Sequence, residues 1–177
     1  MARGRVVIVV TVAVGLGAAL AFWLREAPRR MGGPLNHEAY IWQRDWDGPV
    51  RQAVAAHGAD FEQLMVLAAE VSWRDGRASI VDVSIDAALL REHAGAVGLA
   101  IRVNAYPGPF AEDDAAARAL AALAARRIAE TRDAGLDVAE LQLDFDAATA
   151  RLDGYRAWVR AVRGAIGDVR LTITALP

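Results

Sequence analysis

The 177-residue sequence contains no cysteine and no lysine, so all 20 of its basic residues are arginine. Without cysteine the chain has no thiol nucleophile, no thiolate metal ligand and no disulfide. Without lysine it has no Schiff-base chemistry, no phosphate-loop lysine and no Ser-Lys dyad. His-Glu-x-x-His and Gly-x-Ser-x-Gly motifs are absent as well. Several enzyme classes are therefore excluded, and we expect neither a metal nor another cofactor.

No charge of one sign dominates the chain. The formal net charge is -2 and the isoelectric point is about 5.9. Proteins that bind nucleic acid need an excess of positive charge to neutralise phosphates. The sequence thus indicates no nucleic-acid partner, and it gives no indication of the oligomeric state.

The first 30 residues form a distinct N-terminal region. Residues 6–24 are apolar and uncharged, with arginines on both sides. As a helix this segment is about 28 Å long, close to the ~30 Å of a bilayer core. It is therefore either a membrane anchor or a secretory signal cleaved after Ala19-Leu20-Ala21. We favour the anchor because the apolar residues Phe22, Trp23 and Leu24 continue past that site.

This segment also predicts where the rest of the chain lies. Signal-like segments at an N-terminus usually export the sequence that follows. We expect a cell-envelope protein facing the periplasm or exterior, and a secreted one if the segment is cleaved. The membrane is then a partner through residues 6–24.

Residues 35–177 alternate short apolar runs with helical patterns, which is typical of βα units and a parallel sheet. An Asp75-Gly76 turn predicts one antiparallel hairpin, and Asp86 is expected to cap a short helix. The predicted parallel strands are residues 38–42, 64–71, 97–104, 140–146 and 170–176. The two long helices are predicted from about 112 to 134 and before Gly167.

Side chains alternate within these strands, with one apolar and one polar face. Leu141, Leu143 and Phe145 lie opposite Gln142, Asp144 and Asp146. A doubly wound sheet, covered by helices on both faces, has nearly continuous apolar strands instead. The pattern favours an incomplete (β/α)8 (TIM) barrel, with about five parallel strands and helices on one face. Because no helix follows the fifth strand, we expect a truncated chain or one completed by a partner.

Several segments resemble an uncharacterised bacterial family of exported proteins. The segments are 37–46 (HEAYIWQRDW), 66–71 (VLAAEV), 141–146 (LQLDFD) and 171–177 (LTITALP). This family is a domain of unknown function with a barrel similar to glycoside hydrolases, and its members continue beyond this sequence. The resemblance implies a barrel but no assigned activity. Asp144-Phe145-Asp146 also resembles the end of the fourth strand in chitinase-type barrels, but Ala148 stands where their acid lies.

The candidate site consists of polar residues late in the strands. Asp144 and Asp146 share one strand face, with Cα atoms about 6.6 Å apart, and Glu70 could donate a proton. Glycoside hydrolysis requires such a pair of carboxyl groups. Arg102 and Asn104 are candidates to orient a sugar hydroxyl, and Trp42 or Tyr40 to stack on a sugar ring. A structural alternative is that Arg102 neutralises Glu70 or Asp144.

The sequence leaves three functions open. The first is a glycoside-hydrolase-like enzyme of the envelope, with Asp144, Asp146 and Glu70 as its acidic groups. The second is a noncatalytic protein that binds a polysaccharide or supports the envelope. The third is a nonfunctional gene fragment.

Overall fold

The computed structural model describes residues 37–106, 108–111 and 113–174. The chain divides into two units, residues 1–35 and 36–177, and the described residues belong to the second. The predicted anchor or signal at residues 6–24 therefore lies outside the described residues. Within the described ranges, no helix is long and apolar enough to cross a membrane.

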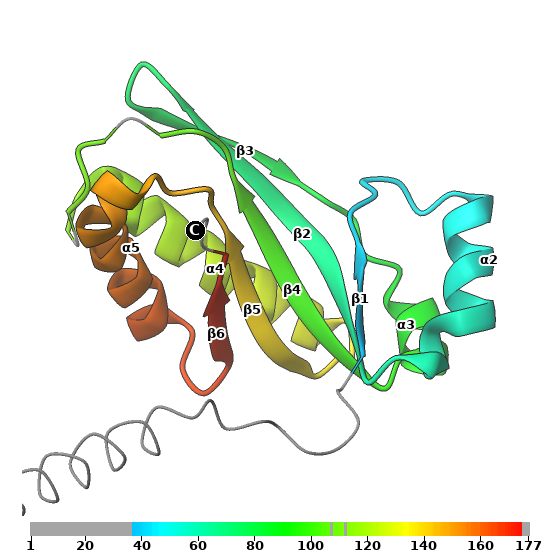
Figure 1. The fold of residues 1–177 in the computed structure, drawn as a ribbon. Coiled ribbons are helices and arrows are strands. Elements are labelled where there is room, and N and C mark those ends of the chain that lie inside the picture. Colours follow the sequence, from blue (N-terminus) through cyan, green and yellow to red (C-terminus); the bar gives the residue numbers. More distant parts are fainter. Residues whose placement is uncertain (1–36, 107, 112, 175–177) are drawn as a thin grey trace, which may run out of the picture. The chain divides into compact units, whose positions relative to one another are not determined.

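The described unit is an α/β fold, as predicted. Its elements (Figure 1) are β1 (Glu38–Ile41), α2 (Gly48–His57), a 3-10 turn (Gly58–Asp60), β2 (Gln63–Arg74), β3 (Arg77–Asp82), α3 (Ala87–His93), β4 (Ala96–Val103), α4 (Ala115–Asp133), β5 (Val138–Asp144), a 3-10 turn (Thr149–Arg151), α5 (Leu152–Ala165) and β6 (Arg170–Ile173).

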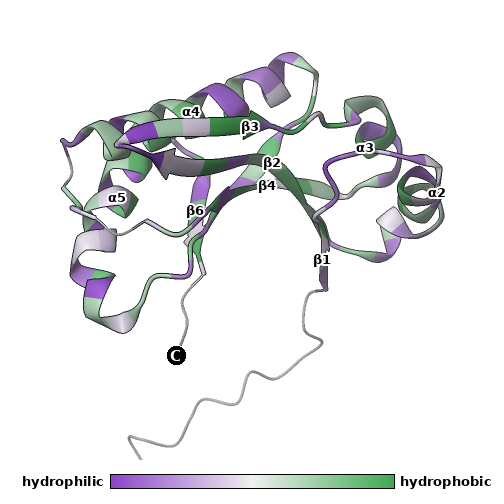
Figure 2. Ribbon diagram, turned by 90° about the horizontal axis from the view of Figure 1, so that it is seen from above, coloured by the Kyte–Doolittle hydropathy of each residue, from purple (hydrophilic) through white to green (hydrophobic). Residues whose placement is uncertain are grey.

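The five parallel strands follow the order β1-β2-β4-β5-β6, which is also their order in the sequence. The order does not reverse anywhere along this path, unlike the order in a doubly wound sheet. Figure 2 shows a strongly curved sheet with the helices on its convex side and an open concave side. Among the described residues β1 and β6 end the path and do not pair with each other, so no closed barrel is present there.

Local signals fix the element ends. Asp47, Asp86 and Asp114 cap α2, α3 and α4, each accepting a hydrogen bond from a backbone N–H three residues later. The Asp75-Gly76 turn has positive φ at both residues, and it joins β2 to the antiparallel β3 as predicted. α4 begins three residues after the predicted start because Asp114 is its cap.

The core lies between the convex face of the sheet and the helices. Leu99, Ile101, Leu141 and Leu143 are fully buried there against α4 and α5. The opposite face of the same strands carries the polar alternation that the sequence predicts. The fold therefore places its polar side chains on the concave side.

Candidate functional site

A β-bulge in β2 sets which of its residues reach the concave face. Leu67 pairs with Ala100 and Glu70 with Arg102, so Ala68 is one extra residue on β2. With regular alternation from Leu67, Glu70 would face the helices instead. The bulge re-aims the Glu70 side chain to the concave side, a known use of bulges. The position of Glu70 at the end of its strand predicts that it belongs to the site, but nothing in the sequence indicates this bulge.

Three of the predicted residues form one row across the sheet. In the strand register, Glu70 on β2 lies beside Arg102 on β4, and Arg102 lies beside Asp144 on β5. Glu70 and Asp144 are thus two strand spacings apart, about 9.6 Å between Cα atoms. The row lies at the carboxyl ends of the parallel strands, where α/β enzymes bind their ligands.

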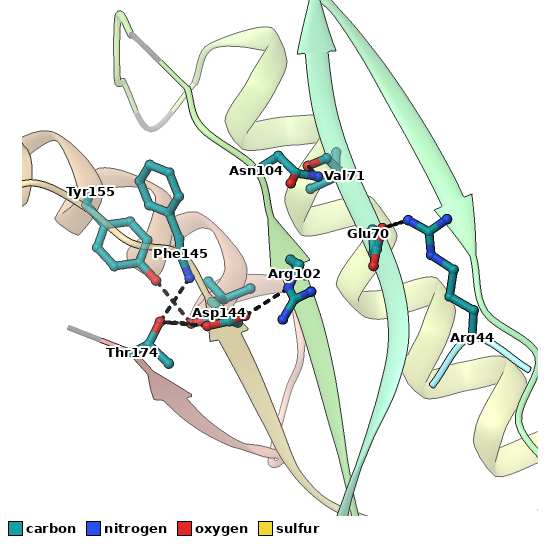
Figure 3. A network of polar contacts seen from close by, with 10 residues as sticks. Arg44, Glu70, Val71, Arg102, Asn104, Asp144, Phe145, Tyr155 and Thr174 are labelled. Carbon is teal, nitrogen blue, oxygen red and sulfur yellow. Dashed lines mark hydrogen bonds and ion pairs between the residues drawn. The ribbon is translucent and has the colours of Figure 1, made fainter. Parts of the chain in front are cut away.

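Asp144 is held by Arg102 on β4 and by Thr174, the residue that follows β6 (Figure 3). Its Oδ2 accepts a hydrogen bond from Arg102 Nε at 3.3 Å, and its Oδ1 accepts one from Thr174 Oγ1 at 3.2 Å. Thr174 also accepts a bond from the Phe145 N–H at 3.0 Å. Of the two partners expected for Arg102, the structure selects Asp144. The Asp144 carboxylate is thereby fixed at the end of β5.

Glu70 has a different cation as its partner. Arg44, in the loop between β1 and α2, forms an ion pair with the Glu70 carboxylate. The hydrogen bond and the charge of Glu70 raise the pKa of Arg44. The Glu70 side chain is only 11% exposed, whereas that of Arg44 is 58% exposed. The exposed Arg44 side chain therefore pairs with a carboxylate that is itself largely buried.

Asp146 lies beyond the end of β5, so the prediction that it belongs to the strand is wrong. The strand ends at Asp144, where the Phe145 N–H turns to Thr174, and the Ala147 N–H then bonds to the Phe145 carbonyl at 2.8 Å. Asp146 is exposed and lines a polar cavity of about 370 Å³. Arg102, Asn104 and Asp144 line the same cavity. The two aspartates are therefore close neighbours, although only one is in the strand.

The remaining predicted binding residues lie at the edges of the row. The Tyr40 and Trp42 rings are stacked, with centroids 5.4 Å apart and planes inclined by 10°. The Arg102 guanidinium lies 4.7 Å from the centroid of the Trp42 ring. Asn104 donates to the Val71 carbonyl from its backbone at 2.9 Å and from Nδ2 at 3.3 Å. Tyr40 is the more exposed of the two aromatic residues, at 43%.

Not every polar residue of the concave face belongs to the site. Glu140, earlier in β5, is buried and accepts bonds from Gln63 at 3.2 Å and from Arg170 and Thr172. These contacts tie β5 to β2 and β6 below the Arg102–Asp144 row. Within the described part of the chain, no three acidic or histidine side chains are grouped as metal ligands would be.

Arg44 and Thr174 belong to the site but were not predicted as site residues. Thr174 had a usable signal, since it continues the polar face of the last strand. Arg44 had none, because its contact depends on the path of the loop after β1.

Comparisons with known proteins bear mainly on the fold. Residues 99–177 match a family described as Domain of unknown function (DUF3142). No curated protein matches the sequence. The catalytic domain of endolysin ply40 from bacteriophage P40 of Listeria monocytogenes has a similar structure, with a TM-score of 0.55 at 13% identity. The spore cortex-lytic enzyme SleL of Bacillus megaterium QM B1551 gives a TM-score of 0.47 at 15% identity.

The chain covers only part of these two structures. The endolysin comparison covers 82% of this chain and 65% of that chain, and the SleL comparison covers 84% and 35%. At such low identity the endolysin likeness shows a shared fold and nothing about activity.

Proposed function

We propose that this chain forms the glycan-binding wall of a glycoside-hydrolase-like protein of the cell envelope. The observation that carries the proposal is the row of Glu70, Arg102 and Asp144 beside a polar cavity on the concave face. Clustered carboxylates and an exposed aromatic ring are what a sugar-cleaving site needs. The fold is one that the catalytic domain of a bacteriophage endolysin also uses.

The proposed reaction uses two carboxyl groups on opposite sides of a glycosidic bond. Asp144, fixed by Arg102 and Thr174, takes a proton from water as the water oxygen bonds to the anomeric carbon. Glu70 donates a proton to the leaving oxygen as the glycosidic bond breaks, and Asp146 contacts the ligand from the cavity rim. Inverting enzymes separate the two carboxyl groups by about 6.5–9.5 Å. Two strand spacings, about 9.6 Å between Cα atoms, fit this class better than the retaining one.

The barrel and the envelope location belong to the same proposal. The open edges at β1 and β6 carry exposed apolar side chains, with Tyr40 43% and Ile173 44% exposed. Further βα units that close a (β/α)8 barrel would cover such edges. Residues 6–24 would hold this domain at the outer side of the membrane, where cell-wall glycan is found.

Substitution of the aspartates tests the enzyme. Asp144→Asn keeps the shape of the side chain but cannot act as a base, so we expect the release of reducing ends from purified peptidoglycan to fall at least about 100-fold. Asp137→Asn, an equivalent change at the other end of β5, should leave turnover unchanged. Equal turnover by both variants would contradict the assignment of Asp144.

A noncatalytic glycan-binding role is the second candidate. It is favoured by the arginine partners of both Glu70 and Asp144, because neither carboxyl is unpaired in this structure. In that case the intact protein binds peptidoglycan without releasing reducing ends. Weaker binding by the double variant Asp144→Asn/Asp146→Asn then distinguishes this role from a purely structural one.

A further inference from the structure

The loop after β1 makes two separate contacts with the candidate site. Arg44 forms its ion pair with Glu70 on β2, and Trp42 lies against the Arg102 guanidinium on β4. Tyr40 stacks on the same tryptophan from β1. The loop is thereby fastened to two members of the Glu70–Arg102–Asp144 row.

The Glu70 carboxylate is largely buried and already has a partner. The cavity is lined by Arg102, Asp144 and Asp146, among others, but not by Glu70. Glu70 is 9% exposed, and Arg44 donates a hydrogen bond to its Oε2. A glycan hydroxyl that donates to this Glu70 oxygen must therefore take the place of Arg44.

We infer that Arg44 is a positioning residue that latches the 42–46 loop over Glu70 and must release this carboxylate before a glycan can contact it. The Arg44 side chain is 58% exposed, and ion pairs with such an exposed partner are weak enough to exchange. Sugar hydroxyls can then donate to Glu70 in its place. A ligand that binds only the unlatched form has its affinity reduced by the fraction of protein that is latched.

The latch can be tested without any ligand. The chain has no cysteine, so Gln43→Cys, at an exposed position beside Arg44, takes a single spin label. We expect Arg44→Ala to increase the mobility of this label, and Arg44→Lys to restore most of the original mobility. Arg156→Ala, an exposed arginine on α5, is the matched control. Unchanged label mobility in Arg44→Ala would overturn the latch.

Binding tests the consequence for the site, and this step rests on the proposed function. We expect Arg44→Ala to bind a tetramer of N-acetylglucosamine about fivefold more tightly, the size that an exposed ion pair allows. The same substitution in a Glu70→Gln background should give no gain, because the latch partner is already neutral. If Arg44 has only a structural role, Arg44→Ala will weaken binding or will change it equally in wild type and in the Glu70→Gln background. Either result overturns the role of Arg44 in access. Increased label mobility with no glycan binding by any variant supports the latch and contradicts the proposed function instead.

Discussion

Each buried or half-buried carboxylate of the site has its own positively charged partner. Asp144 is paired with Arg102, and Glu70 with Arg44. A buried charge without a partner costs several kcal/mol, so this pairing makes a carboxylate-rich concave face compatible with folding. Each of the two carboxylates is bound by a different arginine, so they do not share one cation.

Tyr155 is a buried residue whose pKa is affected by the charge of Asp144. Its hydroxyl is close to the Leu143 carbonyl, at 3.5 Å, and its ring is 2% exposed. Burial, with a smaller effect of the Asp144 charge, raises the pKa of Tyr155 well above its ordinary value. The ionised phenolate is therefore disfavoured in the folded state.

This shift predicts alkaline destabilisation. The folded state keeps the Tyr155 proton to higher pH than the unfolded state, which loses it near pH 10. The stability contributed by this residue is complete below about pH 10 and decreases as the pH rises further. Urea unfolding of wild type and Tyr155→Phe between pH 8 and 11 should show a steeper loss for wild type. Parallel curves for the two proteins would contradict the assignment.

At this scale the sequence predicted most residues of the site but few of their contacts. Alternation along the strands predicted that Arg102 and Asp144 share one face, as the register confirms, whereas Glu70 reaches that face only because of the β2 bulge. The Arg44 contact could not be predicted, because loop paths depend on tertiary packing. The roles of these residues remain predictions.

At the scale of elements, a glycine on β4 makes room for a methionine side chain of β2 on the concave face. Gly98 lies beside Met65, and a Cβ built on Gly98 would come within 2.0 Å of the Met65 sulfur and 2.9 Å of Gln63 Nε2. Met65 is fully buried, so it has little freedom to move away. Alanine at this position would therefore force the Met65 side chain to move.

Gly98→Ala should lower the free energy of unfolding by about 1–3 kcal/mol, as overpacking does. In a Met65→Ala background the same substitution should cost much less, because the clashing sulfur is gone. Gly164→Ala is the matched control: it lies in α5 with no atom within 4 Å of its new Cβ, and should be neutral or stabilising. Urea unfolding of wild type and of the four variants, Met65→Ala included, measures these costs. An equal cost of Gly98→Ala in both backgrounds would refute this packing argument.

The elements themselves were predictable from local signals. Helix caps, the Asp-Gly turn and the apolar runs predicted the order of strands and helices. The polar face of the strands predicted that helices cover only one side of the sheet. The β2 bulge and the early end of β5 were not predictable, since both result from pairing with neighbouring strands.

For the whole molecule, the envelope location makes a clear prediction. Ser84 is exposed, and Ser84→Cys would provide the only cysteine of the chain. If residues 6–24 export the domain, an impermeant maleimide should label this variant in intact spheroplasts as fully as after lysis. Labelling only after lysis would place the domain on the inner side of the membrane.

The central claim is that the concave face binds glycan, and it is common to the enzyme and to the noncatalytic alternative. Amide chemical shifts measured during titration with a tetramer of N-acetylglucosamine test it most directly. We expect the largest changes at Arg102, Asn104, Asp144 and Asp146 and in the 42–46 loop, with small changes in α4 and α5. Changes concentrated on the helices, or no saturable change at any amide, would contradict the claim.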